Sequence, residues 1–124
     1  MSIFRKLFGQ EPEKTTAPAW QTVEQAVIVY LDGSGLPGEI YEQYDLATLE
    51  DRLVQAVERS ASGEYDGNEF GLDGTTLYLY GPDAERLFLA IESALRGYPL
   101  CQNARVVIRR GPPGSPEREL IIGA

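Results

Sequence analysis

The side chains best suited to catalysis or metal binding are carboxylates that lie in one stretch of the chain. Six of them occur with no lysine or arginine between them, namely Glu64, Asp66, Glu69, Asp73, Asp83 and Glu85. Clustered carboxylates can bind Ca²⁺, and a pair of them can hydrolyse glycosides. The run Asp66-x-Asn68 starts like a calcium-binding loop. Phe70 then occupies the third ligand position and Leu77 the position of the bidentate glutamate, so no metal site is expected here.

Several kinds of active site are excluded by the composition. The chain has 124 residues, with no histidine and one cysteine, Cys101. A Cys/His zinc site, a Ser–His or Cys–His nucleophile pair and a disulfide within one chain are therefore impossible. We expect no catalytic residues, no metal and no cofactor. The alternative is a small enzyme or sensor that uses carboxylate and tyrosine side chains in a pocket.

The net charge of −8 is unevenly distributed along the chain. Residues 24–95 hold 15 acidic and 3 basic groups, net −12, whereas residues 96–124 hold five arginines and two glutamates, net +3. An acidic surface repels nucleic acid, whose phosphates require clustered Lys and Arg, and it attracts basic proteins. We expect a protein partner with basic groups and no nucleic acid. The alternative is an acidic surface that serves only solubility.

Tyrosines accompany these acidic residues in the sequence. Tyrosine beside carboxylates is typical of protein-recognition surfaces, because the ring offers a large contact area and loses little rotamer entropy. The candidate residues for binding a protein partner are Tyr30, Glu64, Tyr65, Asp66, Asn68, Glu69, Tyr78, Tyr80 and Arg109. Two structural alternatives remain open: the tyrosines are half-buried strand residues, and Asp66-Gly67 forms a β-bulge.

The N-terminal part of the chain differs in composition from the rest. In residues 1–9 the apolar side chains share one face of a short helix, with two basic residues beside it. Residues 10–18 contain two prolines and no apolar period, which is typical of a linker. We assign residues 1–22 to an amphipathic segment with a linker, and residues 23–124 to a single domain. No run of about 18 apolar residues occurs, so we expect no membrane span and a cytoplasmic protein.

Hydrophobic periodicity predicts the secondary structure of the domain. Alternating or β-branched runs predict strands, and an apolar stripe with a period of about 3.6 residues predicts helices. The predicted strands are 23–31, 64–70, 75–80, 104–110 and 117–122, and the predicted helices are 45–60 and the segment between Asp83 and Gly97. Residues 32–44 are predicted to be a loop. Its glycines match a dinucleotide-binding pattern, but four acidic residues surround them, and seven residues separate them from the next helix.

The order of these elements predicts an α+β fold of the ferredoxin-like βαββαβ type, a two-layer sandwich. Two helices cover one face of an antiparallel sheet, and a C-terminal strand is added at its edge. The side chains expected to face the helices are Val27, Val29, Leu31, Leu77, Leu79, Val106 and Ile108. The expected open face holds Ile28, Tyr30, Tyr78, Tyr80, Arg105, Val107 and Arg109. Such a face is seldom bare, so the N-terminal segment, a second copy in a homodimer or another partner is expected to cover it.

A local resemblance points in the same direction. The stretch Glu64-Tyr65-Asp66-Gly67, on a strand after a helix, resembles the EYDG element of the ribonuclease-activity regulator B family. The following run LYLYGPDAERLF is similar to small bacterial domains of the same ferredoxin-like type, so the resemblance covers roughly residues 63–96. It implies an acidic, non-enzymatic protein that binds and inhibits an RNA-degrading enzyme. Residues 96–124 are basic and apolar where that family has a long acidic tail, so the resemblance does not carry over a specific partner.

These observations favour one functional hypothesis over two others. The leading hypothesis is a non-catalytic acidic protein-binding module, such as an inhibitor or immunity-type partner of a basic nuclease. The first alternative is a structural domain that self-associates through the open face of the sheet. The second is the small enzyme or sensor with a carboxylate-lined pocket.

Overall fold

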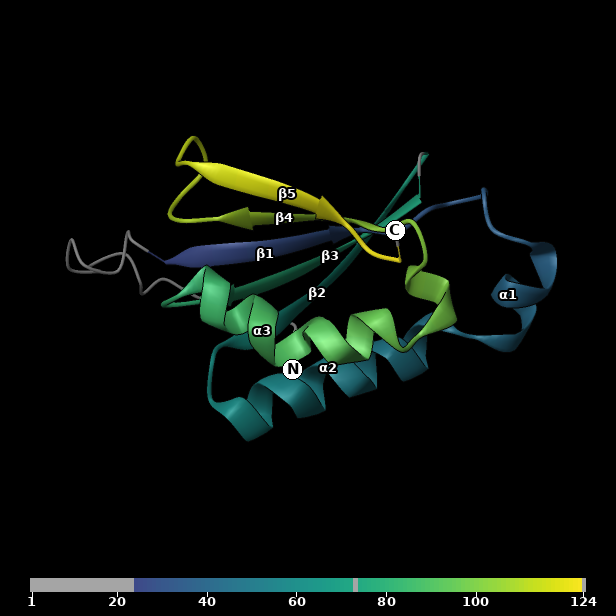
Figure 1. The fold of residues 1–124 in the computed structure, drawn as a ribbon, viewed down its shortest axis with the longest axis horizontal. Helices are drawn as coiled ribbons and strands as arrows, with labels where there is room; N and C mark the ends of the chain where they lie inside the picture. The colour runs from purple at the N-terminus through teal and green to yellow at the C-terminus, as the bar shows by residue number, and fades with distance from the viewer. Residues whose placement is uncertain (1–23, 73, 124) are drawn as a thin grey trace.

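The computed structural model describes residues 24–72 and 74–123 (Figure 1). Its elements in chain order are β1 (Gln25–Tyr30), α1 (Gly38–Gln43), α2 (Leu46–Ser60), β2 (Glu64–Gly71), β3 (Gly74–Gly81), α3 (Ala84–Arg96), the 3-10 turn η3 (Pro99–Cys101), β4 (Arg105–Arg109) and β5 (Glu117–Ile121). The five strands and two long helices predicted from the sequence are all present. The amphipathic segment and linker predicted for residues 1–22 lie outside the described residues.

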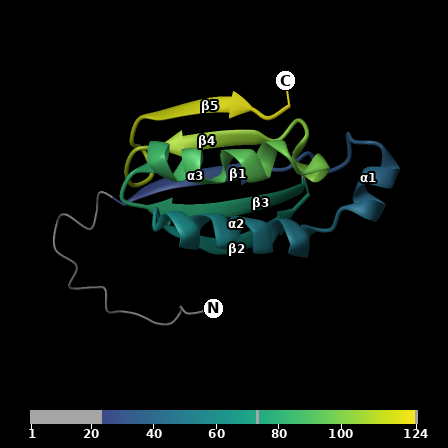
Figure 2. The ribbon, with the colours of Figure 1, turned by 60° about the horizontal axis from the view of Figure 1, so that its bottom comes forward.

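The five strands form one antiparallel sheet in the order β2-β3-β1-β4-β5. The helices α2 and α3 lie side by side on one face of this sheet (Figures 1 and 2). α2 packs against β2, and α3 packs against β1, β3 and β4. This arrangement is an α+β fold that is compatible with a ferredoxin-like sandwich. It leaves the other face of the sheet without either long helix.

The two layers share one apolar core, as the strand alternation predicts. Six side chains of the sheet are fully buried toward the helices, namely Val27, Val29, Leu77, Leu79, Val106 and Ile108. Leu31, the seventh predicted member, belongs to the same core. Leu49 and Leu53 of α2 and Leu87 and Ile91 of α3 pack against them. Burial of each such side chain contributes about 1.5–3 kcal/mol, so this core holds the helices to the sheet.

Both long helices begin at an aspartate that caps the first turn. Asp45 accepts a hydrogen bond from the backbone N–H of Thr48 at 3.2 Å, and Asp83 accepts from the N–H groups of Glu85 and Arg86. The first N–H groups of a helix have no partner within the helix, so a carboxylate satisfies them and favours the helix dipole. The hydrogen bonds from Thr48 hold the pKa of Asp45 below its usual value.

Two glycines allow the chain to cross itself closely at the entry to β2 and the exit from β3. A Cβ atom at Gly63 would collide with the carbonyl oxygen of Tyr80, and one at Gly81 would collide with the carbonyl oxygen of Ser62. Any side chain at either position would therefore push the two backbone segments apart. Glycine is therefore required at both positions, because the segment that leads from α2 into β2 passes directly against the end of β3.

The prediction that residues 32–44 form a loop is wrong in its second half, where α1 begins at Gly38. The gap of seven residues expected between the glycines and the next helix is therefore wrong too. Ile40, Tyr41 and Tyr44 pack against the core, so tertiary contacts stabilise a helix that is too short to persist alone. The glycines and proline of this segment have low helix propensity, so the sequence does not predict α1. Packing against the core outweighs that propensity.

Candidate functional site

The face of the sheet opposite the helices carries a continuous group of tyrosine, arginine and aliphatic side chains. We call it the open-face patch, and it consists of Ala26, Ile28, Tyr30, Tyr78, Tyr80, Arg105, Val107 and Arg109. The aliphatic members Ala26, Ile28 and Val107 form its floor and are 0%, 6% and 4% exposed. The three tyrosines pack around this floor and are only partly buried. Neither α2 nor α3 covers the patch, because both lie on the other face (Figure 2).

The strand register places acidic and basic groups on opposite sides of this patch. Three rows of paired residues cross the sheet from β2 to β4: Glu64–Tyr80–Ala26–Arg109, Gly67–Tyr78–Ile28–Val107 and Glu69–Thr76–Tyr30–Arg105. The first and third rows therefore start with a glutamate on β2 and end with an arginine on β4. Beyond β4, the edge strand β5 adds Glu117 and Glu119 beside Arg109 and Val107.

Short polar contacts orient several side chains of the patch. The hydroxyl of Tyr78 donates a hydrogen bond to Glu69 Oε1 at 2.6 Å, and this bond is the main cause that raises the pKa of Tyr78 to about 12. The guanidinium carbon of Arg105 lies 4.1 Å from the ring centroid of Tyr30. Arg105 Nη1 also lies 2.6 Å from Glu119 Oε2. The cation–π contact and the ion pair together hold Arg105 across the face.

The two charged residues of the first row, Glu64 and Arg109, lack such side-chain partners among the described residues. Arg109 donates its Nε–H to the carbonyl oxygen of Gly111 at 2.7 Å and forms no ion pair with any carboxylate of the described residues. Within residues 24–72 and 74–123, the exposed carboxylate of Glu64 forms neither a hydrogen bond nor an ion pair. A guanidinium carries five N–H donors, so Arg109 retains the capacity to bind a carboxylate.

A β-bulge in β2 divides the candidate residues between the two faces of the sheet. The register shifts between Tyr65 and Gly67, so that Asp66 is the additional residue, and Gly67 adopts a φ of 122°. Tyr65 and Asn68 consequently face α2. The hydroxyl of Tyr65 and Nδ2 of Asn68 donate to Glu50 Oε2 at 2.6 Å and 2.7 Å. These two residues therefore attach β2 to α2 and do not join the open-face patch.

Six of the nine candidate residues share the open face: Tyr30, Glu64, Glu69, Tyr78, Tyr80 and Arg109. Asp66 lies exposed in the bulge. Burial, followed by the charge of Asp66, raises the pKa of Tyr80. Sequence reasoning placed Arg105 on this face but not among the binding residues. It missed Glu50 altogether, because the pairing of a helix residue with a strand residue leaves no periodic signal.

Groups with other possible chemistry are occupied or buried. The Asp32 carboxylate accepts hydrogen bonds from the N–H groups of Ser34 and Gly35, and the Tyr41 hydroxyl accepts from the N–H of Leu36. Three of the backbone donors that a phosphate could use in this glycine loop are thus already bonded. Burial raises the pKa of the Cys101 thiol to about 12, which keeps it protonated. No three His, Cys, Asp or Glu side chains in the described part of the chain could hold a metal ion.

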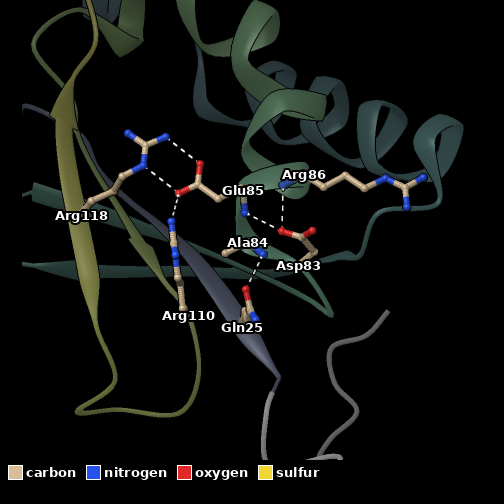
Figure 3. Close-up of polar contacts among 7 residues, drawn as sticks. All are labelled: Gln25, Asp83, Ala84, Glu85, Arg86, Arg110 and Arg118. Atoms are coloured by element: carbon tan, nitrogen blue, oxygen red, sulfur yellow. Dashed lines mark hydrogen bonds and ion pairs between the residues drawn. The ribbon is translucent and has the colours of Figure 1, made fainter.

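A second polar cluster connects the last strand to the start of α3 (Figure 3). Arg118 of β5 forms two bonds of 2.7 Å to the carboxylate of Glu85, and Arg110 approaches the same carboxylate at 3.4 Å. The bonds from Arg118 lower the pKa of Glu85 to about 2. Beside this cluster, Gln25 Oε1 accepts from the N–H of Ala84 at 2.8 Å. The cluster holds β5 against the helix layer and lies on the face opposite the open-face patch.

Charge is separated between the two sides of the fold. α2 and β2 together hold six acidic residues and two arginines. α3, β4 and β5 hold four acidic residues and five arginines. The sheet order places β2 at one edge and β4 and β5 at the other, so the open-face patch lies between an acidic side and a weakly basic side.

The comparisons with known proteins add no relative. No protein-family model, no curated protein and no solved structure matches the chain. The resemblance to the ribonuclease-activity regulator B family therefore stays a prediction. Within residues 24–72 and 74–123, none of the helices has the length and apolar character needed to cross a membrane.

Proposed function

We propose that the protein is a non-catalytic protein-binding module, and that the open-face patch with Glu64 and Glu69 is its binding surface. The observation that carries the proposal is the convergence of six of the nine candidate residues on the sheet face opposite both long helices. Tyrosine and arginine over a buried aliphatic floor are the side chains that contribute most to protein interfaces. Tyr78 is already oriented by Glu69, so it loses little freedom on binding.

The partner that fits this surface is a protein with basic groups. The acidic side chains of α1, α2 and β2 attract such a protein and accelerate its encounter. An inhibitor or immunity-type partner of a basic nuclease, the hypothesis taken from the sequence, falls within this class. The cytoplasmic location expected from the sequence remains part of the same proposal.

We also infer that the domain is ferredoxin-like, with β5 as an added edge strand. Two features support this inference. The helices α2 and α3 each connect two strands, β1 to β2 and β3 to β4, and in each case a third strand lies between the two in the sheet. All neighbours are antiparallel. This split βαβ unit, repeated twice, is the defining connection of that fold.

Affinity capture with the tagged full-length chain tests the proposed function. The wild type is compared with Tyr78→Ala and with a control on the helix layer, Leu89→Ala, whose side chain is 69% exposed on α3. We expect a partner that the wild type and the control recover and that Tyr78→Ala loses. We also expect recovery to fall when the salt is raised from about 0.1 M to about 1 M, where charges are screened within about 3 Å. Recovery of only those proteins that Tyr78→Ala also retains would contradict the proposal.

A further inference from the structure

The side chains in each row across the open-face patch are arranged so that the same face of a second copy can be complementary to them. Each row runs from β2 through β3 and β1 to β4. A two-fold rotation about an axis parallel to the strands turns a second sheet over and reverses this order, while each row stays opposite the same row. With the axis between β1 and β3, β2 of one copy lies over β4 of the other, and β3 lies over β1.

We propose that the open-face patch binds the open-face patch of a second copy of this chain about that axis. This inference rests on the proposed function, because it names the protein partner of the same surface. The basic groups required of the partner are then supplied by β4 of the second copy.

The charges support this pairing. In the first row, Glu64 lies opposite Arg109 of the second copy, and neither group forms an ion pair within the described residues of its own chain. In the third row, Glu69 lies opposite Arg105. The two-fold symmetry produces each pair twice. A foreign partner would have to reproduce this spacing of charges, whereas a second copy has it by identity.

The sizes of the opposed side chains also fit. In each row a smaller residue lies opposite a larger one: Ala26 opposite Tyr80, Gly67 opposite Val107, and Thr76 opposite Tyr30. The remaining pair of the second row, Ile28 opposite Tyr78, joins an aliphatic side chain to an aromatic ring. Facing sheets pack about 10 Å apart, and side chains of this complementary size can interdigitate at that distance. The second copy would then cover the exposed parts of the three tyrosine rings, which are only partly buried in the single chain.

The geometry tolerates the twist of real sheets. Strands of packed sheets cross at about 30°, and β2 and β4 lie about 7 Å from the axis, so opposed side chains are displaced by about 4 Å. Glutamate and arginine can span this offset. Four strands and three rows give a flat footprint of about 400 Å² per copy, which is small beside the roughly 800 Å² of a standard interface. We therefore expect a reversible dimer with a dissociation constant in the micromolar range.

Charge reversal with sedimentation velocity tests this inference on the full-length chain, from about 1 to about 100 µM to bracket that range. Glu64→Arg places two arginines opposite each other, and Arg109→Glu places two glutamates opposite each other. We expect each variant alone to dimerise at least about tenfold more weakly. An equimolar mixture of the two should dimerise again, because both pairs in the mixed dimer join opposite charges. The matched controls, Glu58→Arg on α2 and Arg86→Glu on α3, are exposed and should dimerise like the wild type.

The possible results separate this inference from the proposed function. A wild type that stays monomeric throughout, or a mixture that stays monomeric, would overturn the second-copy inference. If that monomer still captures a basic protein that Tyr78→Ala loses, the proposed function stands with a foreign partner. If neither a dimer nor such a partner is found, both fail. Circular dichroism checks the folding of each variant. If a charge-reversal variant does not fold, the neutral substitutions Glu64→Gln and Arg109→Gln replace it, and we expect them to cause a smaller loss of dimer.

Discussion

Replacing Glu50 by alanine should loosen the edge strand β2 from α2. Glu50 Oε2 accepts two hydrogen bonds, at 2.6 Å from the Tyr65 hydroxyl and 2.7 Å from Asn68 Nδ2. A hydrogen bond to a charged group contributes about 1.5–3 kcal/mol. Asn68 is exposed and can turn to water, so most of the loss comes from the partly buried hydroxyl of Tyr65. We expect Glu50→Ala to lower the free energy of unfolding by about 2 kcal/mol.

Urea unfolding followed by circular dichroism measures this change. Glu58→Ala is the matched control on the same helix and should stay within about 0.5 kcal/mol of the wild type. Tyr65→Phe removes the hydroxyl but keeps the ring, which completes a double-mutant cycle with Glu50→Ala. Since the two residues touch directly, we expect a coupling energy of about 1 kcal/mol.

The cycle also decides whether Tyr65 has a structural role. If Glu50→Ala were no more destabilising than Glu58→Ala, or if the coupling were near zero, the contacts with α2 would not be significant. Tyr65 and Asn68 would then be surface residues again, and the division of the candidate site by the bulge would lose its energetic basis. A clear coupling assigns Tyr65 to the structure and leaves recognition to the open-face patch.

Three further predictions concern ionisable groups. Tyr78, whose pKa in the fold is about 12, should stabilise the protein below about pH 10 and lose this contribution as the pH rises toward 12. In an absorbance titration, Glu69→Gln should lower the pKa of Tyr78. Glu85, whose pKa in the fold is about 2, should stabilise the protein at pH values above its usual pKa of 4.5 and lose this contribution as the pH falls toward 2. Arg118→Ala should reduce the difference between the urea midpoints measured at about pH 7 and about pH 3. Cys101 should react with a thiol reagent only after unfolding, since its side chain is fully buried.

Local patterns were enough to predict the five strands, the two long helices and the two faces of the central strands, but not the short helix α1. The alternation in β1 and β3 separates Val27 and Leu79, which are buried toward the helices, from Ile28 and Tyr78 on the other face. The apolar stripe of α2 follows the helical period, and Asp45 marks its start. Such signals depend on neighbours within a few residues, so a single sequence contains them.

The division of the candidate site could not be predicted in the same way. Strict alternation would put Tyr65 and Glu69 on one face of β2. The additional residue Asp66 shifts the register, so Glu69 reaches Tyr78 on the open face while Tyr65 reaches α2. The sequence suggested a bulge at Gly67, but the choice of face depends on pairing with β3. The attachment of Arg118 to Glu85 spans 33 residues and depends on the return of β5, which leaves no local signal.

The two proposals together predict a competition. Glu64 and Glu69 cannot pair with the arginines of a second copy and with a foreign basic protein at the same time. If both bind the open-face patch, the foreign protein binds only the monomer, and its apparent affinity falls as the concentration of the chain rises above the dimer dissociation constant. Titration of the captured partner at about 1 µM and about 100 µM chain measures this, and Arg109→Glu, which weakens the dimer, should abolish the difference. Equal affinity at both concentrations would show that the partner binds elsewhere, and the acidic side chains of α1 and α2 would then be the next surface to test.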